Sequence, residues 1–151
     1  MNPKELPDIS LFRHHCDLQI RFSDVDILGH VNNTVYLAFY DTGKAHYFRD
    51  VRKEAFSWND VDTVIANVNC AFISSIVFGE QIEVLTRCLE IHDKSFRLQQ
   101  MIREKNTGEV KSICETVMVS FSPETKKSVP VSEYWRRALS GYEKRDLEIK
   151  H

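Results

Sequence analysis

The chain has 151 residues, 42% of them hydrophobic, and a formal charge of −2, which suits one globular domain with a buried core. This near-balance of charge excludes the strong basic field that draws proteins to nucleic acids. No stretch approaches the run of about 18 apolar residues that a membrane span needs, and the first ten residues lack the apolar centre of a signal peptide. We therefore expect a cytoplasmic protein with no nucleic-acid partner and no membrane span.

The first predicted elements are a strand and a long helix. Residues 16–22 alternate loosely between apolar and polar side chains, which is typical of a strand. After a polar stretch, Asn32, Asn33 and Thr34 suit the N-terminus of a helix. Apolar residues then recur every three or four positions to about Arg49 and mark the buried helix face. Gly43 would cost this helix about 1 kcal/mol relative to alanine, so we expect a close packing contact there.

Strands dominate the rest of the chain. A charged, less regular link at residues 51–60 precedes four strand-like segments at residues 63–76, 81–92, 95–105 and 109–122. Short turns at residues 78–80, 92–94 and 106–108 join the strands, so an antiparallel meander is predicted. The charged tail, residues 131–151, is expected to be helical at least through Leu139.

One strand, one long helix and a meander describe a single α+β domain over residues 1–151, with its core at about residues 14–130. The helix must bury its apolar face, and the concave face of the sheet is the only large surface available to it. We expect a curved antiparallel sheet wrapped around one central helix.

The four cysteines are Cys16, Cys70, Cys88 and Cys114, and no two are close in sequence. Each lies in or beside an apolar, strand-like segment. They are interpreted as buried, reduced thiols that act as small hydrophobic residues. Neither a metal site nor a disulfide framework is predicted.

The most informative stretch is RFSDVDILGHVNN at residues 21–33, between the first strand and the helix. It resembles the signature of the 4-hydroxybenzoyl-CoA thioesterase family, D-x-D-x-x-G-H-x-N-N followed by an aromatic-rich helix. Further matches follow in order at residues 68–72, 78–80, 94–96 and 121–125. The resemblance therefore covers about residues 16–130, and it implies a single hotdog fold.

The resemblance also implies an activity and an assembly. It implies hydrolysis of an acyl-CoA thioester, in a homodimer or homotetramer with active sites at the subunit interface. The family's catalytic carboxylate corresponds to Asp26, and the backbone amide that faces the thioester carbonyl corresponds to Asn33. Coenzyme A is part of the substrate, so no further cofactor is expected.

Thioester hydrolysis needs a nucleophile for the carbonyl carbon and a donor for the developing oxyanion. A carboxylate such as Asp26 can activate water or attack directly to give a mixed anhydride. A helix N-terminus offers free N–H groups and a favourable dipole to the oxyanion. The seven residues from Asp26 to Asn33 allow a loop to fold back over the helix start.

The roles of other residues near the motif can be interpreted in more than one way. His30 either orients the carboxylate, water or leaving thiolate, or bonds the backbone of the loop. Asp24 either pairs with Asp26, braces the loop or faces solvent. The Asn32 and Asn33 side chains are interpreted as caps or loop braces rather than as catalysts. Asp41 is an alternative carboxylate on the helix, since another branch of the fold uses one there.

Substrate contacts are expected from three residues. The resemblance places Lys94 at the phosphates of CoA, where an exposed cation is chemically suitable, with Ser95 beside it at the strand start. Tyr36 belongs to the helix aromatics, one or two of which are expected to line the acyl tunnel.

Two alternatives stay open. The chain could be an acyl-ACP thioesterase, whose plant members share the H-V-N-N element of residues 30–33 but are longer, double-domain chains. It could also be a non-catalytic acyl-CoA-binding protein, although Asp26 is retained and neither terminus resembles a DNA-binding segment. The residues do not distinguish among acyl groups.

Overall fold

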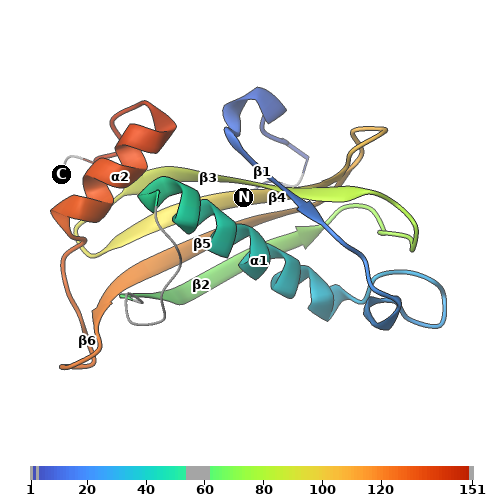
Figure 1. Cartoon of the computed structure of the whole chain (residues 1–151), viewed down its shortest axis with the longest axis horizontal. Coiled ribbons are helices and arrows are strands. Elements are labelled where there is room, and N and C mark those ends of the chain that lie inside the picture. Colours follow the sequence, from blue (N-terminus) through green and yellow to red (C-terminus); the bar gives the residue numbers. More distant parts are fainter. Residues whose placement is uncertain (1, 3, 54–61, 150–151) are drawn as a thin grey trace.

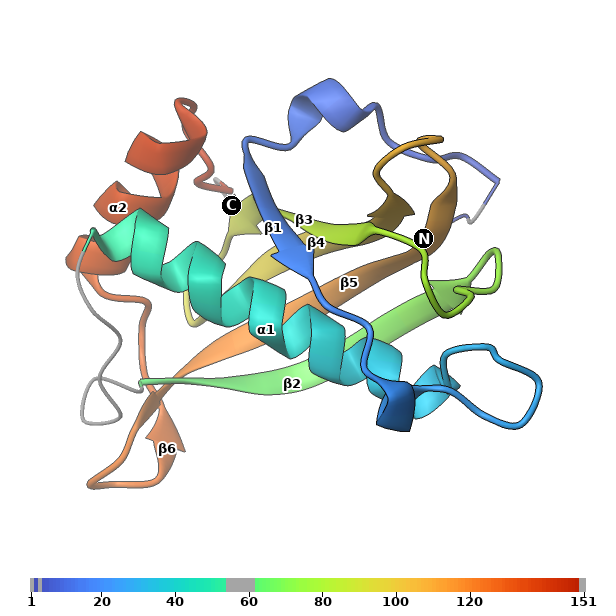
Figure 2. The same ribbon diagram turned by 45° about the vertical axis from the view of Figure 1, so that its right-hand side comes forward.

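In the computed structural model, which describes residues 2, 4–53 and 62–149, one curved sheet holds a long helix against its concave face (Figures 1 and 2). The principal strands are β1 (His14–Leu18), β2 (Thr63–Phe72), β3 (Ile82–Ile91), β4 (Ser95–Glu104) and β5 (Val110–Ser122). They pair antiparallel in the order β1-β3-β4-β5-β2, and the short β6 (Lys127–Ser128) pairs with β5. The α+β hotdog fold is thereby confirmed.

The central helix α1 spans Asn33–Arg52 and lies diagonally across the sheet. Asn32 caps it, because its side-chain oxygen accepts from the Thr34 N–H at 3.2 Å. At Gly43, an added Cβ would lie 2.8 Å from a Val84 methyl carbon, so the predicted close contact with the sheet is confirmed.

Register shifts bend three of the strands around this helix. They occur between Ile65 and Asn67 in β2, between Cys88 and Glu90 in β3, and at Lys111 in β5, which is left unpaired opposite Ile102 and Arg103. Irregularities of this kind bend a strand and increase its local twist, which lets one sheet enclose a helix.

The C-terminal helix α2 (Glu133–Glu143) packs beside the last turns of α1, so the expected helical tail is confirmed. On the other face of the sheet, Phe12 packs against Leu85 and Met101, next to the 3-10 turn η1 (Ile9–Leu11). Among the described residues, neither helix is both long and apolar enough to cross a bilayer.

Several predicted boundaries were wrong. The first strand ends at Leu18, and Phe22–Asp24 form a 3-10 turn, η2, because the Asp24 carboxylate accepts from the Arg21 N–H at 2.8 Å. Strand β2 ends at Phe72 rather than at residue 76. Beyond it, the N–H groups of Ile73 and Ser74 both donate to the Lys111 carbonyl oxygen, at 2.9 and 3.1 Å, and the chain leaves the ladder.

The helix also continues beyond the predicted end at Arg49, to Arg52. The start of the predicted link, Val51 and Arg52, therefore belongs to α1. Lys53 is its C-cap, and residues 54–60 of that link lie outside the described residues.

Strand β2 forms one border of the sheet (Figure 2). Most of its side chains are exposed. Within the described parts of the chain, no strand pairs with its outer edge. Apolar side chains are prominent among the exposed ones: Val64, Ile65, Val68 and Phe72. An unpaired, apolar edge of this length is a ready site for pairing with another strand.

Candidate active site

A tight loop before α1 carries Asp26. The Asp26 N–H donates to the His30 carbonyl at 2.9 Å, and the Gly29 N–H donates to the Asp26 carbonyl at 3.0 Å. Val25 and Val31 face each other as an antiparallel bridge, so the loop is a miniature hairpin. Gly29 closes it with a φ of +78°, a conformation that side chains disfavour.

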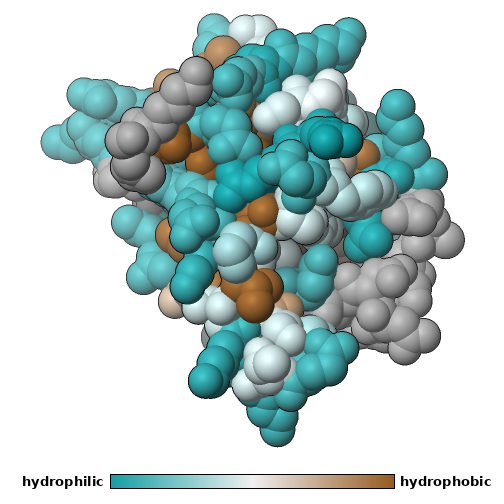
Figure 3. All heavy atoms as spheres, turned by 90° about the vertical axis from the view of Figure 1, so that its left-hand side faces the viewer, coloured by the Kyte–Doolittle hydropathy of each residue, from teal (hydrophilic) through white to brown (hydrophobic). Residues whose placement is uncertain are grey.

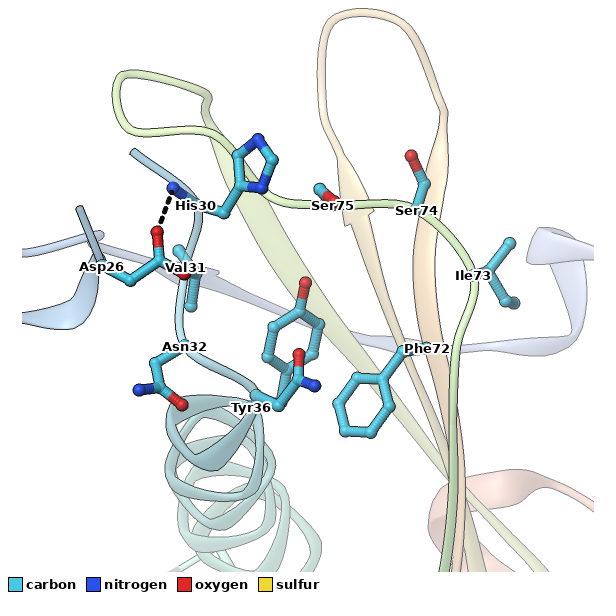
Figure 4. A pocket seen from close by; sticks show the side chains of 10 residues that line it. Asp26, His30, Val31, Asn32, Tyr36, Phe72, Ile73, Ser74 and Ser75 are labelled. Atoms are coloured by element: carbon cyan, nitrogen blue, oxygen red, sulfur yellow. Dashed lines mark hydrogen bonds between the residues drawn. The ribbon is translucent and has the colours of Figure 1, made fainter. Parts of the chain in front are cut away.

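The loop also fixes the Asp26 carboxylate. One oxygen, Oδ1, accepts from the N–H groups of Leu28 at 2.9 Å and His30 at 3.2 Å. Figure 4 shows the carboxylate held in this way beside the pocket. The other oxygen accepts no hydrogen bond from the described residues, so it remains available for a substrate or a water molecule.

The start of α1 provides the second chemical element. Asn33 is the first helical residue and lines the same pocket as Asp26. Its backbone N–H donates to no acceptor in the part of the chain that the structure describes, as expected for the first turn of a helix. The helix dipole also favours negative charge at this point. A free amide and a carboxylate therefore share one pocket.

The pocket has a volume of about 330 Å³. On one side Tyr36 contacts Phe72 edge to face, with ring centroids 5.0 Å apart. On the other side lie His30 and the turn formed by Ser74 and Ser75 (Figure 4). Burial raises the pKa of Tyr36, so its hydroxyl stays protonated at neutral pH.

A buried lysine holds that serine turn in place. Lys111 is almost completely buried, and its Nζ donates to the Ser75 carbonyl at 2.9 Å. It also pairs with Glu80 at 2.9 Å and with Glu109. Burial alone would lower the pKa of Lys111, but its two carboxylate partners outweigh that effect and raise it.

The two other carboxylates considered from the sequence lie apart from the pocket lining. Asp24 is buried and bound to the Arg21 guanidinium at 3.0 Å, so it braces the loop. Burial opposes its ionisation, yet the hydrogen bonds and charge of Arg21 prevail and lower the Asp24 pKa. Asp41 is exposed on α1 and pairs with Lys44 at 3.4 Å.

Lys94 and Ser95 lie at the opposite end of the sheet. The Lys94 carbonyl accepts from the Ser120 N–H at 2.9 Å, and Ser120 pairs with Thr63 at the start of β2. The pocket adjoins Phe72, at the far end of that ten-residue strand. At about 3.3 Å per residue, the two ends are roughly 30 Å apart. One chain therefore does not bring Lys94 and Asp26 together.

Sequence reasoning missed part of the pocket wall: Phe72, Ile73, Ser74 and Ser75. The paired serines that interrupt the apolar run after residue 73 were a usable signal for the end of the strand. Among the described residues, no cluster of three or more His, Cys, Asp or Glu side chains could hold a metal ion.

The chain is similar to known thioesterases in sequence and in structure. Over 125 aligned residues, which cover 81% of this chain and 93% of the relative, the sequence is 22% identical to the long-chain acyl-CoA thioesterase FadM of Escherichia coli. A thioesterase structure from Thermus thermophilus, complexed with coenzyme A and Zn, superposes with a TM-score of 0.81 at 24% identity. That match covers 91% of this chain and 98% of the other.

A 1,4-dihydroxy-2-naphthoyl-CoA thioesterase from Synechocystis has the same fold, with a TM-score of 0.73 at 14% identity. The match covers 83% of this chain and 93% of that one. Residues 20–139 match the family model of the thioesterase-like superfamily. This match covers most of the chain and includes both Asp26 and Asn33. The chain belongs to the thioesterase-like superfamily and is a thioester hydrolase with the hotdog fold.

Proposed function

We propose that this protein hydrolyses acyl-CoA thioesters, with Asp26 as the catalytic carboxylate and the Asn33 N–H as the oxyanion donor. The observation that carries the proposal is the meeting of these two groups in one pocket. One carboxylate oxygen has no hydrogen-bond partner in the described part of the chain, and the amide lies at the positive end of a 20-residue helix.

The thioester carbonyl would lie against the start of α1, with its oxygen toward the Asn33 N–H. Asp26 either removes a proton from an attacking water or attacks the carbonyl carbon itself to form a mixed anhydride. In both routes the carbonyl oxygen becomes an oxyanion, and the amide stabilises it as the C–S bond breaks and the CoA thiolate leaves. Loss of one such donor costs other enzymes about 10²–10³ in rate.

Three pocket residues support this chemistry. His30 donates its backbone N–H to the Asp26 carboxylate, and its ring lies at the pocket (Figure 4). Tyr36 and Phe72 offer apolar ring surface to the acyl group. These groups suffice for hydrolysis, so we propose that no cofactor is needed beyond the CoA of the substrate.

The remaining site residues would come from a second copy of the chain. If two β2 strands pair antiparallel at their free edges, the Thr63 end of one lies beside the Phe72 end of the other. Lys94 and Ser95 of one copy then approach the Asp26 pocket of its partner. We therefore propose a homodimer, which can assemble further into a homotetramer, with Lys94 at the CoA phosphates.

The test measures thiol release from a panel of short, medium, long and aromatic acyl-CoAs. We expect turnover of at least one class, and we expect the rate of thiol release to fall at least about a hundredfold in Asp26→Asn. Calorimetry should show that this variant still binds the substrate. Binding without thiol release by the wild-type protein would support the non-catalytic alternative, and turnover of acyl-ACP alone would support the carrier-protein alternative.

A further inference from the structure

Two cysteines face each other across neighbouring strands beneath the pocket. Cys70 of β2 and Cys114 of β5 are directly opposed in the ladder, flanked by the pairs Asn69–Glu115 and Ala71–Ile113. Directly opposed residues of an antiparallel pair have Cα atoms about 4.5–5.5 Å apart. Disulfides span about 4.4–6.8 Å between Cα atoms. The register alone therefore places the two cysteines within bonding range.

Polar groups also surround the two sulfur atoms. The Cys114 sulfur lies 3.8 Å from the Thr116 hydroxyl oxygen. The Cys70 sulfur also lies 3.5 Å from the Ser112 hydroxyl oxygen. That hydroxyl is held in place, since it donates to the Ala71 carbonyl at 2.9 Å and accepts from the Tyr40 hydroxyl at 2.7 Å. Both thiols point to the concave side of the sheet, toward α1.

The surroundings make the two thiols unequal. Hydrogen bonding with Cys114 lowers the pKa of Cys70 to about 6, against the effect of burial and with help from Ser112 and the Lys44 charge. The same interaction and burial raise the pKa of Cys114. Cys70 is therefore the thiol that ionises more readily, and Cys114 is the one that keeps its proton. An activated thiolate beside a resolving thiol is the arrangement of redox-sensing cysteines.

The remaining two cysteines have no such arrangement. Cys16 is opposed by Val84 and Cys88 by Leu98, so each faces an aliphatic partner. Burial raises the pKa of Cys88 to about 12 and also raises that of Cys16. Of the four cysteines, only Cys70 and Cys114 form an opposed pair.

We propose that Cys70 and Cys114 are a redox-active pair, which a hydroperoxide converts into a cross-strand disulfide. The Cys70 thiolate attacks one peroxide oxygen, the O–O bond breaks, and the leaving hydroxide takes up a proton as water. The Cys114 sulfur then attacks the Cys70 sulfenic acid, forming the S–S bond as its proton and the hydroxyl leave as a second water. The two thiols lose two electrons, and the peroxide gains them.

The position of the pair gives the oxidant a route. Cys70 keeps part of its surface exposed, and it lies two residues before the pocket residue Phe72, on the same face of β2. Hydrogen peroxide is little larger than water, so it can reach this partly buried sulfur. A bulkier oxidant, such as a disulfide-containing molecule, cannot. The proposal does not depend on the reaction that the pocket catalyses.

The experiment treats the reduced, full-length protein with hydrogen peroxide and then alkylates the remaining thiols with N-ethylmaleimide before mass spectrometry. We expect two of the four thiols to be lost, a mass decrease of two hydrogen atoms, and full reversal by dithiothreitol. Peptide mapping should locate the bond between Cys70 and Cys114.

Three variants separate the roles. Cys114→Ser should accumulate a Cys70 sulfenic acid that dimedone traps, whereas Cys70→Ser should react with peroxide at least about tenfold more slowly. Cys16→Ser is the matched control and should form the disulfide like the wild type. Cys114→Ala provides a second variant if Cys114→Ser fails to fold. Four alkylated thiols after peroxide treatment, or a bond to Cys16 or Cys88, would overturn the proposal.

Discussion

The two ends of α1 differ in what surrounds them. At the N-terminal end, the Asn33 amide opens into a solvent-accessible pocket beside the exposed Asp26 loop. At the C-terminal end, Tyr47 and Phe48 are packed among aromatic rings of β4 and α2. There the Phe48 ring lies 5.3 Å from that of Trp135. One helix thus offers free backbone donors at one end and buried side chains at the other.

This difference separates reactivity from stability along a single element. Free N–H groups at a helix start stabilise an anion, whereas buried aromatic rings stabilise the fold through their apolar area. Substitutions at the C-terminal end should therefore change the free energy of unfolding and leave the rate of the folded protein unchanged. Substitutions at the Asp26 loop should do the reverse.

The largest effect on stability is expected from Trp135→Ala. The Trp135 ring is buried, stacks on Phe96 and donates its indole N–H to both carboxylate oxygens of Asp62 at 3.0 Å. Its removal should lower the free energy of unfolding by about 3–5 kcal/mol, measured by urea denaturation. Trp135→Phe is the control and should lose less. Unchanged stability in Trp135→Ala would mean that the aromatic cluster at the C-terminal end of α1 does not stabilise the fold.

A smaller loss is expected from Gly43→Ala, midway along the helix. The new methyl group would meet Val84 at 2.8 Å and Gln100 at 3.0 Å. Overpacking typically costs about 1–3 kcal/mol, which exceeds the helix-propensity gain of about 1 kcal/mol. Thermal unfolding should therefore show a lower melting temperature. A higher one would mean that the helix and the sheet can separate at little cost.

Asn32→Ala should cost about 1 kcal/mol, because it removes the side-chain cap of the helix. Since the cap lies next to Asn33, thiol release should slow as well. Asn32→Ser retains a capping oxygen and should preserve both properties. A loss of stability with no change in rate would show that the position of the amide does not depend on the cap.

The smallest predicted effect is a change in the pH dependence of stability. His14 is buried beside Tyr47 and Tyr142, its Nε2 bonds the Asp50 carboxylate at 2.7 Å, and its Nδ1 has no partner among the described residues. Burial lowers its pKa, despite the opposing effects of the hydrogen bond and charge of Asp50.

Below the unfolded-state pKa of about 6.5, the unfolded chain binds the proton more readily than the folded one. The His14 contribution is therefore complete above that pH and is lost as the pH falls through the folded-state pKa. Between pH 7 and pH 5, the wild type should lose more stability than His14→Gln does, as measured by urea denaturation at each pH. Equal losses would contradict the assignment.

The sequence predicted those parts of the molecule that depend on neighbouring residues. The Asn32 cap, the length of the strands and the turns between them are local, and they are confirmed within a few residues. The close contact at Gly43 was also predicted, because a glycine inside a helix is costly unless a side chain would clash there. The position of the Asp26 loop was predicted because its polar residues directly precede the helix cap.

Contacts between distant segments were beyond such reasoning. The Ser74–Ser75 turn is positioned by Lys111, which is 36 residues from Ser75 in the chain, and nothing local indicates that pairing. The separation of Lys94 from Asp26 follows from the sheet order, which the strand pattern leaves open. The opposed cysteines likewise depend on the register of β2 and β5, so they read as isolated thiols in the sequence.

Asp26→Asn and Asp41→Asn should be compared on the acyl-CoA that the wild type hydrolyses best, to test directly whether Asp26 is the catalytic carboxylate. Both changes replace a carboxylate with an amide of the same shape at an exposed position. We expect Asp26→Asn to lose at least about a hundredfold in kcat and Asp41→Asn to stay within about twofold, with no change of melting temperature in either variant. Full activity in Asp26→Asn together with inactivity in Asp41→Asn would contradict this role of Asp26 and move the reaction to the exposed face of α1.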